Sequence, residues 1–219
     1  MEKRFVSSNH LSTKRDYLGR VNEVDKAQAS EKAIKWGKDY WDGSRLTGYG
    51  GYKYDGRWLK VAQKLVDEYQ LNDHSKILDV GSGKGFLLSD FLKVNNTFDV
   101  YGIDISEYAL AHSMEDVKEQ CIHGNASKLP WEDDSFDLVI SIDTIHNLHL
   151  EDLINSLNEI QRVSRKYSFI CVESYRNERE KMNLMYWQLT CRAFFTPKDW
   201  EYLFRLTQFT GDHEFIYFE

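Results

Sequence analysis

Short apolar runs alternate along the middle of the chain with segments whose apolar residues recur every three or four positions. Runs of this length with β-branched residues are typical of buried strands, and the longer period is typical of amphipathic helices. The predicted strands are residues 77–80, 98–105, 120–123, 136–142, 168–172 and an edge strand at 214–218. The predicted helices between them are 87–92, 108–117 and 153–163. This alternation predicts an α/β fold in which right-handed crossovers cover both faces of a parallel sheet.

The first 58 residues have a different character. Residues 1–30 are polar with weak periodicity, so we expect a flexible start followed by one or two short helices. Residues 36–58 combine glycines with many aromatic side chains, which predicts an ordered functional loop because linkers are rarely so aromatic. Helical spacing begins at Trp58 and continues to Tyr69. We therefore expect a cap segment at 1–58 and one domain at 59–219.

The distribution of charge limits the partners of this chain. Its 219 residues carry a formal net charge of −7, which disfavours non-specific nucleic-acid binding. Residues 1–60 nevertheless hold 13 lysines and arginines against eight acidic residues, a net charge of +5. A basic segment on an acidic body is suited to attract an anionic acceptor. Solvated surface lysines would give the same numbers.

Cysteine use and hydropathy point to a reducing compartment. Cys121, Cys171 and Cys191 are odd in number and scattered, which fits neither a disulfide framework nor a zinc site. No apolar run approaches 20 residues, and no apolar region follows Met1. We expect a cytoplasmic protein with no membrane span and no bound metal.

A glycine-rich turn, residues 81–85, follows the strand at 77–80. A phosphate-binding Walker A loop is excluded because Gly85, not Ser or Thr, follows Lys84. A dinucleotide fingerprint would need its third glycine one position later. Asp104 ends the next strand 25 residues after Asp79, near the spacing at which a carboxylate meets ribose hydroxyls. A glycine-rich turn of this kind brings backbone N–H groups close to a ligand.

Residues 79–85 resemble motif I of the class I S-adenosylmethionine-dependent methyltransferases. The resemblance continues in order through 102–106, the acidic end of the second strand, through 124–139, where the family binds adenine, and through 159–163. It covers about residues 76–172 and is nearest to the small-molecule (type 11) members. It implies a Rossmann-like, doubly wound, mostly parallel sheet and S-adenosyl-L-methionine as cofactor. With that cofactor, we expect the backbone N–H groups of the turn to bind the carboxylate of its amino-acid tail, and Asp79 to compensate the ammonium group of the tail.

The same resemblance implies the cofactor-binding residues. They are Asp79, Gly81, Gly83, Gly85, Asp104, Ile105, Asn125 and Ala126. Asn125 stands where the family often has Asp, and its carbonyl can still accept from the adenine amino group. Residues 165–167 replace the family's Pro-Gly-Gly turn, and one strand replaces the usual terminal hairpin.

Catalytic residues are expected after the fourth strand, because ligands lie at the carboxyl ends of parallel strands. His146 is the predicted general base, since histidine titrates near neutrality. Asp143 is predicted to orient His146 or to bind an acceptor amine. Alternatively, Asp143 caps a helix that begins near Leu150, and His149 is expected to face solvent. The arrangement loosely resembles phosphobase N-methyltransferases, with an Asp–His spacing one residue shorter.

Acceptor contacts are predicted from Tyr49, Tyr52 and Arg57 in the cap and from Arg176 after the fifth strand. The alternatives are an Asp55 helix cap and a surface salt bridge of Arg176, while Trp187 is expected to pack in the core or lid. The aromatic block is similar to one in methyltransferases of bacterial surface-polysaccharide or capsule pathways, which implies a sugar, phosphorylated or phosphoramidate-type acceptor. A phosphobase-type N-methyltransferase and a non-catalytic S-adenosylmethionine-binding module remain as alternatives. The partner is expected to be a small molecule, and the sequence does not indicate the oligomeric state.

Overall fold

Six parallel strands form one sheet at the centre of the chain. The structure is a computed structural model, and it describes residues 1–11 and 13–219. The strands lie in the order β3-β2-β1-β4-β5-β6, and each neighbouring pair is parallel. Their bounds are β1 (Lys76–Val80), β2 (Asp99–Asp104), β3 (Cys121–His123), β4 (Phe136–Ile142), β5 (Ser164–Glu173) and β6 (Asp212–Ile216). The predicted doubly wound parallel sheet is confirmed, with β6 as a single edge strand.

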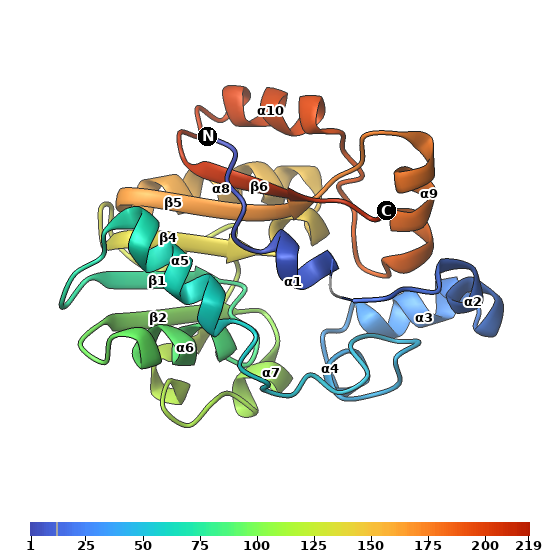
Figure 1. Cartoon of the computed structure of the whole chain (residues 1–219), viewed down its shortest axis with the longest axis horizontal. Coiled ribbons are helices and arrows are strands. Elements are labelled where there is room, and N and C mark those ends of the chain that lie inside the picture. The colour runs from blue at the N-terminus through green and yellow to red at the C-terminus, as the bar shows by residue number, and fades with distance from the viewer. Residues whose placement is uncertain (12) are drawn as a thin grey trace.

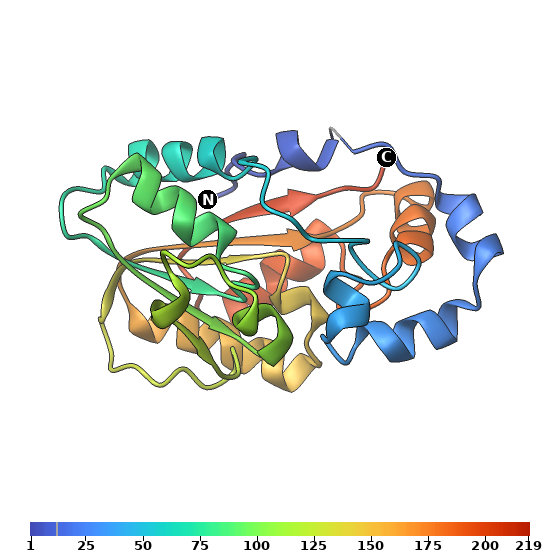
Figure 2. The same ribbon diagram turned by 90° about the horizontal axis from the view of Figure 1, so that it is seen from below.

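Helices cover both faces of this sheet (Figures 1 and 2). On one side lie α5 (Leu59–Tyr69) and α6 (Phe86–Val94), and on the other lie α8 (Leu150–Val163) and α10 (Pro197–Leu206). The remaining helical elements are α1 (Ser7–Leu11), α2 (Tyr17–Glu23), α3 (Lys26–Ala33), α4 (Lys38–Trp41), α7 (Glu107–Ala111), η1 (Lys118–Gln120), η2 (Ile145–Asn147) and α9 (Glu178–Trp187). None of the helices within the described ranges is long and apolar enough to cross a membrane.

The strands read as continuous apolar runs because both faces are buried. Successive side chains of a strand point to opposite faces. Leu138 and Ile140 of β4 therefore join the core beneath α5 and α6, whereas Val139 between them joins the core beneath α8 and α10. Two apolar layers, one on each side of the sheet, stabilise the domain.

The helix expected at 108–117 is wrong in length, since α7 ends at Ala111. Beyond it the chain turns toward the glycine-rich turn, and the Met114 N–H donates to the Lys84 carbonyl at 3.0 Å. Val117 is buried against Gly85, where an added Cβ would lie 2.8 Å from Val117 Cγ2. The apolar residues Met114 and Val117 therefore reflect contact with the glycine-rich turn rather than one face of a helix.

The flexible start expected for residues 1–30 is also wrong for its first residues. The backbone of Glu2 forms a parallel β-bridge with His213 of β6, and the side chains of Phe5 and Val6 are buried in the core. The Glu214 carboxylate, itself buried, accepts the backbone N–H groups of residues 5, 6 and 7 at 2.6–2.8 Å. A carboxylate at these amides satisfies the unpaired donors that begin α1.

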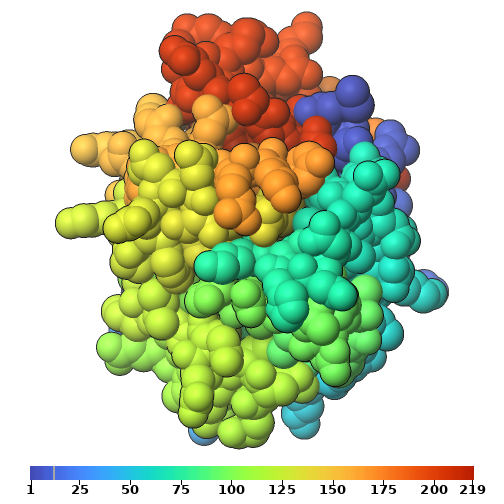
Figure 3. Space-filling model, turned by 90° about the vertical axis from the view of Figure 1, so that its left-hand side faces the viewer, coloured from blue at the N-terminus to red at the C-terminus, as the bar shows by residue number. Residues whose placement is uncertain are grey.

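The rest of the N-terminal segment, residues 1–58, lies beyond the carboxyl ends of the strands. Figures 1 and 2 both place α2, α3 and α4 at that end of the sheet. Figure 3 shows the opposite end, covered by the teal-to-red part of the chain with N-terminal residues only at its margin. The edge where parallel strands bind ligands is thus the edge that this segment covers.

Glu214→Ala is expected to lower the free energy of unfolding by about 3 kcal/mol, because buried backbone N–H groups lose a charged acceptor. Glu214→Gln keeps one acceptor oxygen and should lose less. Urea unfolding followed by circular dichroism measures both, with Glu201→Ala on the exposed face of α10 as the control. Equal midpoints for Glu214→Ala and Glu201→Ala would contradict this role.

Candidate functional site

The glycine loop, residues 81–85, turns from β1 into α6 with a backbone that excludes side chains. Gly81 and Gly83 have φ of +88° and +53°, a region that favours glycine. An added Cβ would lie 2.0 Å from Thr144 Oγ1 at Gly81 and 2.8 Å from the Trp41 ring at Gly83. The turn therefore packs closely against both neighbours.

The expectation that backbone N–H groups of this loop bind a ligand carboxylate is wrong for four of its five residues. Gly81 and Ser82 both donate to the Ile103 carbonyl, Gly83 donates to Asp104, and Gly85 donates to the Ser82 carbonyl. Three of these amides thus donate to the end of β2, and the fourth donates within the turn.

Two buried carboxyls stand at the ends of β1 and β2. Asp104 accepts the Gly83 N–H with Oδ2 and the Ser106 N–H with Oδ1, each at 2.7 Å. Burial raises the pKa of Asp104, and these two hydrogen bonds oppose the rise. Asp79 is 5% exposed and accepts no hydrogen bond within the described part of the chain. Burial, and then the charge of Asp104, raises the pKa of Asp79 to about 8.

These groups line a first cavity of about 210 Å³. Of the predicted cofactor residues, those that line it are Asp79, Gly81, Gly83, Asp104, Ile105, Asn125 and Ala126. Gly85 does not line it; it stands at the N-cap of α6 and packs on Val117. Asn125 Oδ1 already accepts the Ser127 N–H at 3.0 Å. No group of three or more His, Cys, Asp or Glu in residues 1–11 and 13–219 is placed to hold a metal ion.

Aromatic side chains of the N-terminal segment form the opposite wall of this cavity. Trp41 stacks on Tyr49 with ring centroids 5.5 Å apart, and Tyr49 contacts Tyr52 at 4.4 Å. Tyr52 in turn stacks on Phe86, the first residue of α6, at 4.8 Å. A continuous aromatic surface therefore faces the carboxyls at the strand ends.

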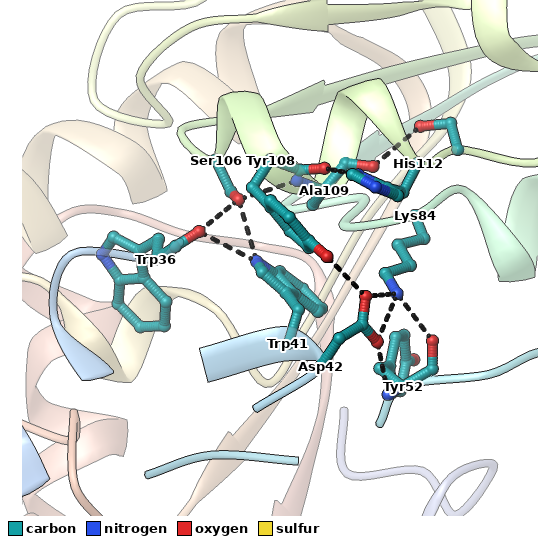
Figure 4. A network of polar contacts seen from close by, with 10 residues as sticks. Trp36, Trp41, Asp42, Tyr52, Lys84, Ser106, Tyr108, Ala109 and His112 are labelled. Atoms are coloured by element: carbon teal, nitrogen blue, oxygen red, sulfur yellow. Dashed lines mark hydrogen bonds and ion pairs between the residues drawn. The ribbon is translucent and has the colours of Figure 1, made fainter. Parts of the chain in front are cut away.

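An ion pair joins this wall to the glycine loop (Figure 4). Lys84 Nζ donates to both oxygens of Asp42, at 2.8 and 2.7 Å, and to the Tyr52 carbonyl at 2.9 Å. The Tyr108 hydroxyl also donates to Asp42, and Trp41 Nε1 donates to Ser106 Oγ at 2.8 Å. The Lys84 side chain is only 7% exposed. Removing Asp42 would leave this ammonium buried without its counter-charge.

A second cavity of about 350 Å³ adjoins the first. The residues that line both are Tyr40, Tyr49, Tyr52, Trp58, Asp143 and Asn147. The two cavities therefore share a boundary formed by these side chains.

Asp143 lies at the junction of the two cavities. It has φ of +54°, which is uncommon for a residue other than glycine, and its buried Oδ1 has no hydrogen-bond partner. Burial, and then the charge of Glu214, raises the pKa of Asp143 to about 7. The alternative role as a helix cap does not hold, because His149 occupies the N-cap position of α8.

His146 lines the second cavity but is only 2% exposed. Its Nδ1 accepts the Glu173 N–H at 3.4 Å, and its Nε2 lies 3.4 Å from Glu173 Oε2. Burial lowers the pKa of His146 to about 3, so the imidazole is a weak proton acceptor in this state. Its role as general base stays a prediction. His149 is exposed, as expected.

The predicted acceptor residues are not all brought together. Tyr49 and Tyr52 line both cavities, and Arg57 lines the second, where Asp55 pairs with its guanidinium. Asp55 is not the cap of α5, since Trp58 holds that position. Arg176 lines neither cavity; it pairs with Glu180 and Glu219 and lies over the Tyr217 ring.

Four residues of the second cavity were missed. Arg15, Arg20 and Arg45 line it together with Trp187, which was expected to pack in the core or lid. The positive charge of residues 1–60 was the available signal. It could not identify which of 13 basic residues face the cavity.

Comparisons with known proteins agree with this geometry. A family described as "Methyltransferase domain" matches residues 71–211. Demethylmenaquinone methyltransferases of Staphylococcus saprophyticus and of Staphylococcus aureus (strain MRSA252) are each 30% identical to this chain, over 136 and 161 residues. The matches cover 59% and 70% of this chain but only 56% and 63% of those relatives, so the chain spans less than two thirds of their length.

A solved structure shows the same fold. The YcgJ protein of Bacillus subtilis matches 67% of each chain with a TM-score of 0.55 and 17% sequence identity. Residues 1–70 lie outside the family match, so the arginines of the second cavity belong to a part of the chain that the match does not describe.

Asp42→Ala is expected to lower the free energy of unfolding by about 2 kcal/mol, because the buried Lys84 ammonium loses its counter-charge. Asp55→Ala breaks an exposed ion pair in the same segment and should change stability by less than about 1 kcal/mol. Adding Lys84→Met to Asp42→Ala should recover part of the loss. Chemical denaturation of the wild type and these three variants measures the effect. Equal losses for Asp42→Ala and Asp55→Ala would show that the Lys84–Asp42 contact is not a major source of stability.

Proposed function

The chain belongs to the methyltransferase domain family, whose cofactor is S-adenosylmethionine, and we propose that it transfers the cofactor's methyl group to a small acceptor held in the second cavity. The observation that carries this proposal is the junction between the cavities, where six side chains face both. Methyl transfer is an in-line displacement, so the acceptor atom and the methyl carbon must meet at such a boundary.

The residues of the first cavity fit the cofactor. Each Asp104 oxygen accepts one backbone N–H, which leaves lone pairs for the two ribose hydroxyls. The Asp79 carboxyl accepts no hydrogen bond from the described residues, so it is suited to accept one from the cofactor's ammonium group. Ile105 and Ala126 provide apolar surface for adenine. These assignments, and the assignment of Asn125 to the adenine amino group, are part of the proposal.

The protein's contribution to the reaction is alignment, exclusion of water and acceptance of a proton. The cofactor supplies a methyl carbon activated by the neighbouring sulfonium. Tyr40, Tyr49 and Tyr52 form the aromatic side of the junction and would exclude water from it. Asp143 presents an unpartnered carboxyl oxygen there, and its pKa of about 7 suits a base at neutral pH. We propose Asp143 as the proton acceptor, with His146 as the second candidate.

The acceptor is proposed to be anionic, because Arg15, Arg20, Arg45 and Arg57 line the second cavity. A sugar, phosphorylated or phosphoramidate-type precursor of a surface polysaccharide fits this charge, and a role in capsule biosynthesis in the cytoplasm is part of the same proposal. Residues 1–58 are proposed to act as the cap, since they supply most of the wall opposite the strand ends. Phosphobase-type N-methylation is the second candidate, because Asp143 is also placed to bind an acceptor ammonium.

A product screen tests the function directly. Purified protein is incubated with S-adenosylmethionine carrying a labelled methyl group and with three acceptor panels: phosphorylated sugars, amino phosphates and a short-chain demethylmenaquinone. Mass spectrometry then identifies the labelled product. Label in the quinone alone would assign demethylmenaquinone methylation, the activity for which the staphylococcal relatives are named, to this chain and would overturn the anionic acceptor. Cofactor binding without any labelled product would indicate a non-catalytic module.

Binding of S-adenosylhomocysteine, the demethylated cofactor, is expected to release close to one proton at pH 7. Asp79, with a pKa of about 8, is mostly protonated in the free protein, and an ammonium beside it favours the carboxylate. The affinity should therefore rise between pH 6.5 and 8. Calorimetry in buffers of different ionisation enthalpy counts the protons. Asp79→Asn should release none, and release by that variant equal to the wild type would assign the proton to another group.

Asp143→Asn is expected to lower kcat about 10²–10⁴-fold with little change in the Kd for S-adenosylhomocysteine, because the amide accepts no proton. In the wild type kcat should fall as the pH drops below about 7, where Asp143 becomes protonated. His146→Ala and the exposed His149→Ala are compared in the same assay. A rate that is independent of pH between 5 and 8, with loss only in His146→Ala, would return the role to His146.

A further inference from the structure

Three arginines of the N-terminal segment converge on one tryptophan of α9. The guanidinium carbons of Arg15, Arg20 and Arg45 lie 5.5, 4.6 and 5.1 Å from the centroid of the Trp187 ring. All four residues line the second cavity. Three positive charges are thus confined around a single aromatic ring at the wall of a cavity; we call them the arginine cluster.

The arginine cluster has no carboxylate partner within residues 1–11 and 13–219. Arg15 donates to the His10 and Thr13 carbonyls and to His10 Nδ1, and Arg20 donates to the Arg45 carbonyl at 2.8 Å. Arg45 donates to the carbonyls of residues 48 and 49. Arg57, Arg162 and Arg176, by contrast, each form an ion pair with a carboxylate.

Donors of the cluster also remain unused. The Nε atoms of Arg15 and Arg20 are buried and have no hydrogen-bond partner among the residues that the structure describes. A buried donor without a partner is costly, so such atoms mark places where a ligand or an ordered water completes the structure. Burial together with mutual repulsion lowers the pKa of Arg20 to about 10, a further sign of unbalanced positive charge.

The carbonyls fix the orientation of the guanidiniums without neutralising them, and Trp187 keeps them together. A guanidinium over an indole face is attracted by the ring, which offsets part of the repulsion between like charges. Trp187 is in this sense a positioning residue. The three guanidiniums therefore do not neutralise one another, and some of their N–H groups stay available to a bound anion.

The geometry points to an anion subsite in the second cavity, formed by Arg15, Arg20 and Arg45 on Trp187, that binds a phosphate monoester of the acceptor. This inference rests on the proposed function and names the chemical class of its acceptor. A phosphate monoester near neutral pH carries close to two negative charges and three terminal acceptor oxygens, which matches three guanidinium forks. A carboxylate offers one charge and two oxygens, and it would leave two of the three arginines unbalanced, whereas the phosphate leaves one.

The acidic side chains of the same cavity are compatible with this subsite. Asp143 and Glu173 also line it, and their charges act on Arg15. Burial raises the pKa of both carboxyls, which reduces the negative charge that an incoming anion meets. Asp143 moreover faces the first cavity, so the phosphate would bind at the arginine side while the acceptor atom faces the cofactor.

Calorimetry on the full chain, saturated with S-adenosylhomocysteine, tests the subsite with inorganic phosphate and acetate as probes. We expect phosphate to bind at least roughly tenfold more tightly than acetate. Arg15→Met and Arg20→Met should each weaken phosphate binding roughly tenfold. Arg192→Met, at an exposed arginine outside both cavities, is the matched control and should leave the affinity for phosphate unchanged.

Trp187 is tested by selectivity rather than by stability. Trp187→Leu should reduce the preference for phosphate over acetate, and Trp187→Phe, which keeps an aromatic face, should restore most of it. The Kd for S-adenosylhomocysteine reports whether each variant is folded, and it should stay unchanged throughout.

The outcomes separate this inference from the proposed function. Phosphate that binds no better than acetate, or that binds Arg15→Met and Arg20→Met as tightly as the wild type, overturns the subsite while the methyltransferase proposal stands. A wild-type chain that fails to bind S-adenosylhomocysteine overturns the proposed function itself. Tight, arginine-dependent phosphate binding supports the subsite.

Discussion

The ion pair between Lys84 and Asp42 is the contact on which the arrangement of both cavities depends. Lys84 belongs to the glycine loop and is almost fully buried, so its ammonium needs a counter-charge from elsewhere in the chain. Asp42, at the end of α4, provides it and receives a further hydrogen bond from Tyr108. The aromatic residues on either side of Asp42 are thereby held against the ends of β1 and β2. Without this contact the first cavity would lack one wall.

The two cavities differ in charge, and this follows from which parts of the chain form them. The parallel strands bring the carboxyls of Asp79, Asp104 and Asp143 to one edge of the sheet, where backbone crossovers leave space for a ligand. The N-terminal segment brings arginines to the far side of the same space. Under the proposed function, the acidic floor would bind the positively charged groups of S-adenosylmethionine, and the basic wall would bind an anionic acceptor.

Much of the fold could be predicted from the sequence because its signals are local. The strand 136–142 is found at its predicted bounds, since an apolar run buried on both faces is unambiguous. The glycine loop and Asp104 are likewise located by short motifs at the ends of strands. The predicted length of the helix at 108–117 was wrong because its signal is not local. Met114 and Val117 are apolar because they contact the glycine loop, and spacing alone does not distinguish such a contact from a helix face.

The sequence by itself determined the strands of the sheet, the strand-end side of the first cavity and the family, because each depends on short motifs whose residues are close together in the chain. Only the tertiary structure decided which charges face the second cavity. Arg57 and Arg176 lie in plausible positions along the sequence, yet nearby carboxylates neutralise both. Arg15, Arg20 and Arg45 form no ion pair with a carboxylate in the described part of the chain, and they meet Trp187 where α2 packs beside α9. Whether a charged side chain is paired or free depends on distances between remote segments, and periodicity and composition do not contain those distances.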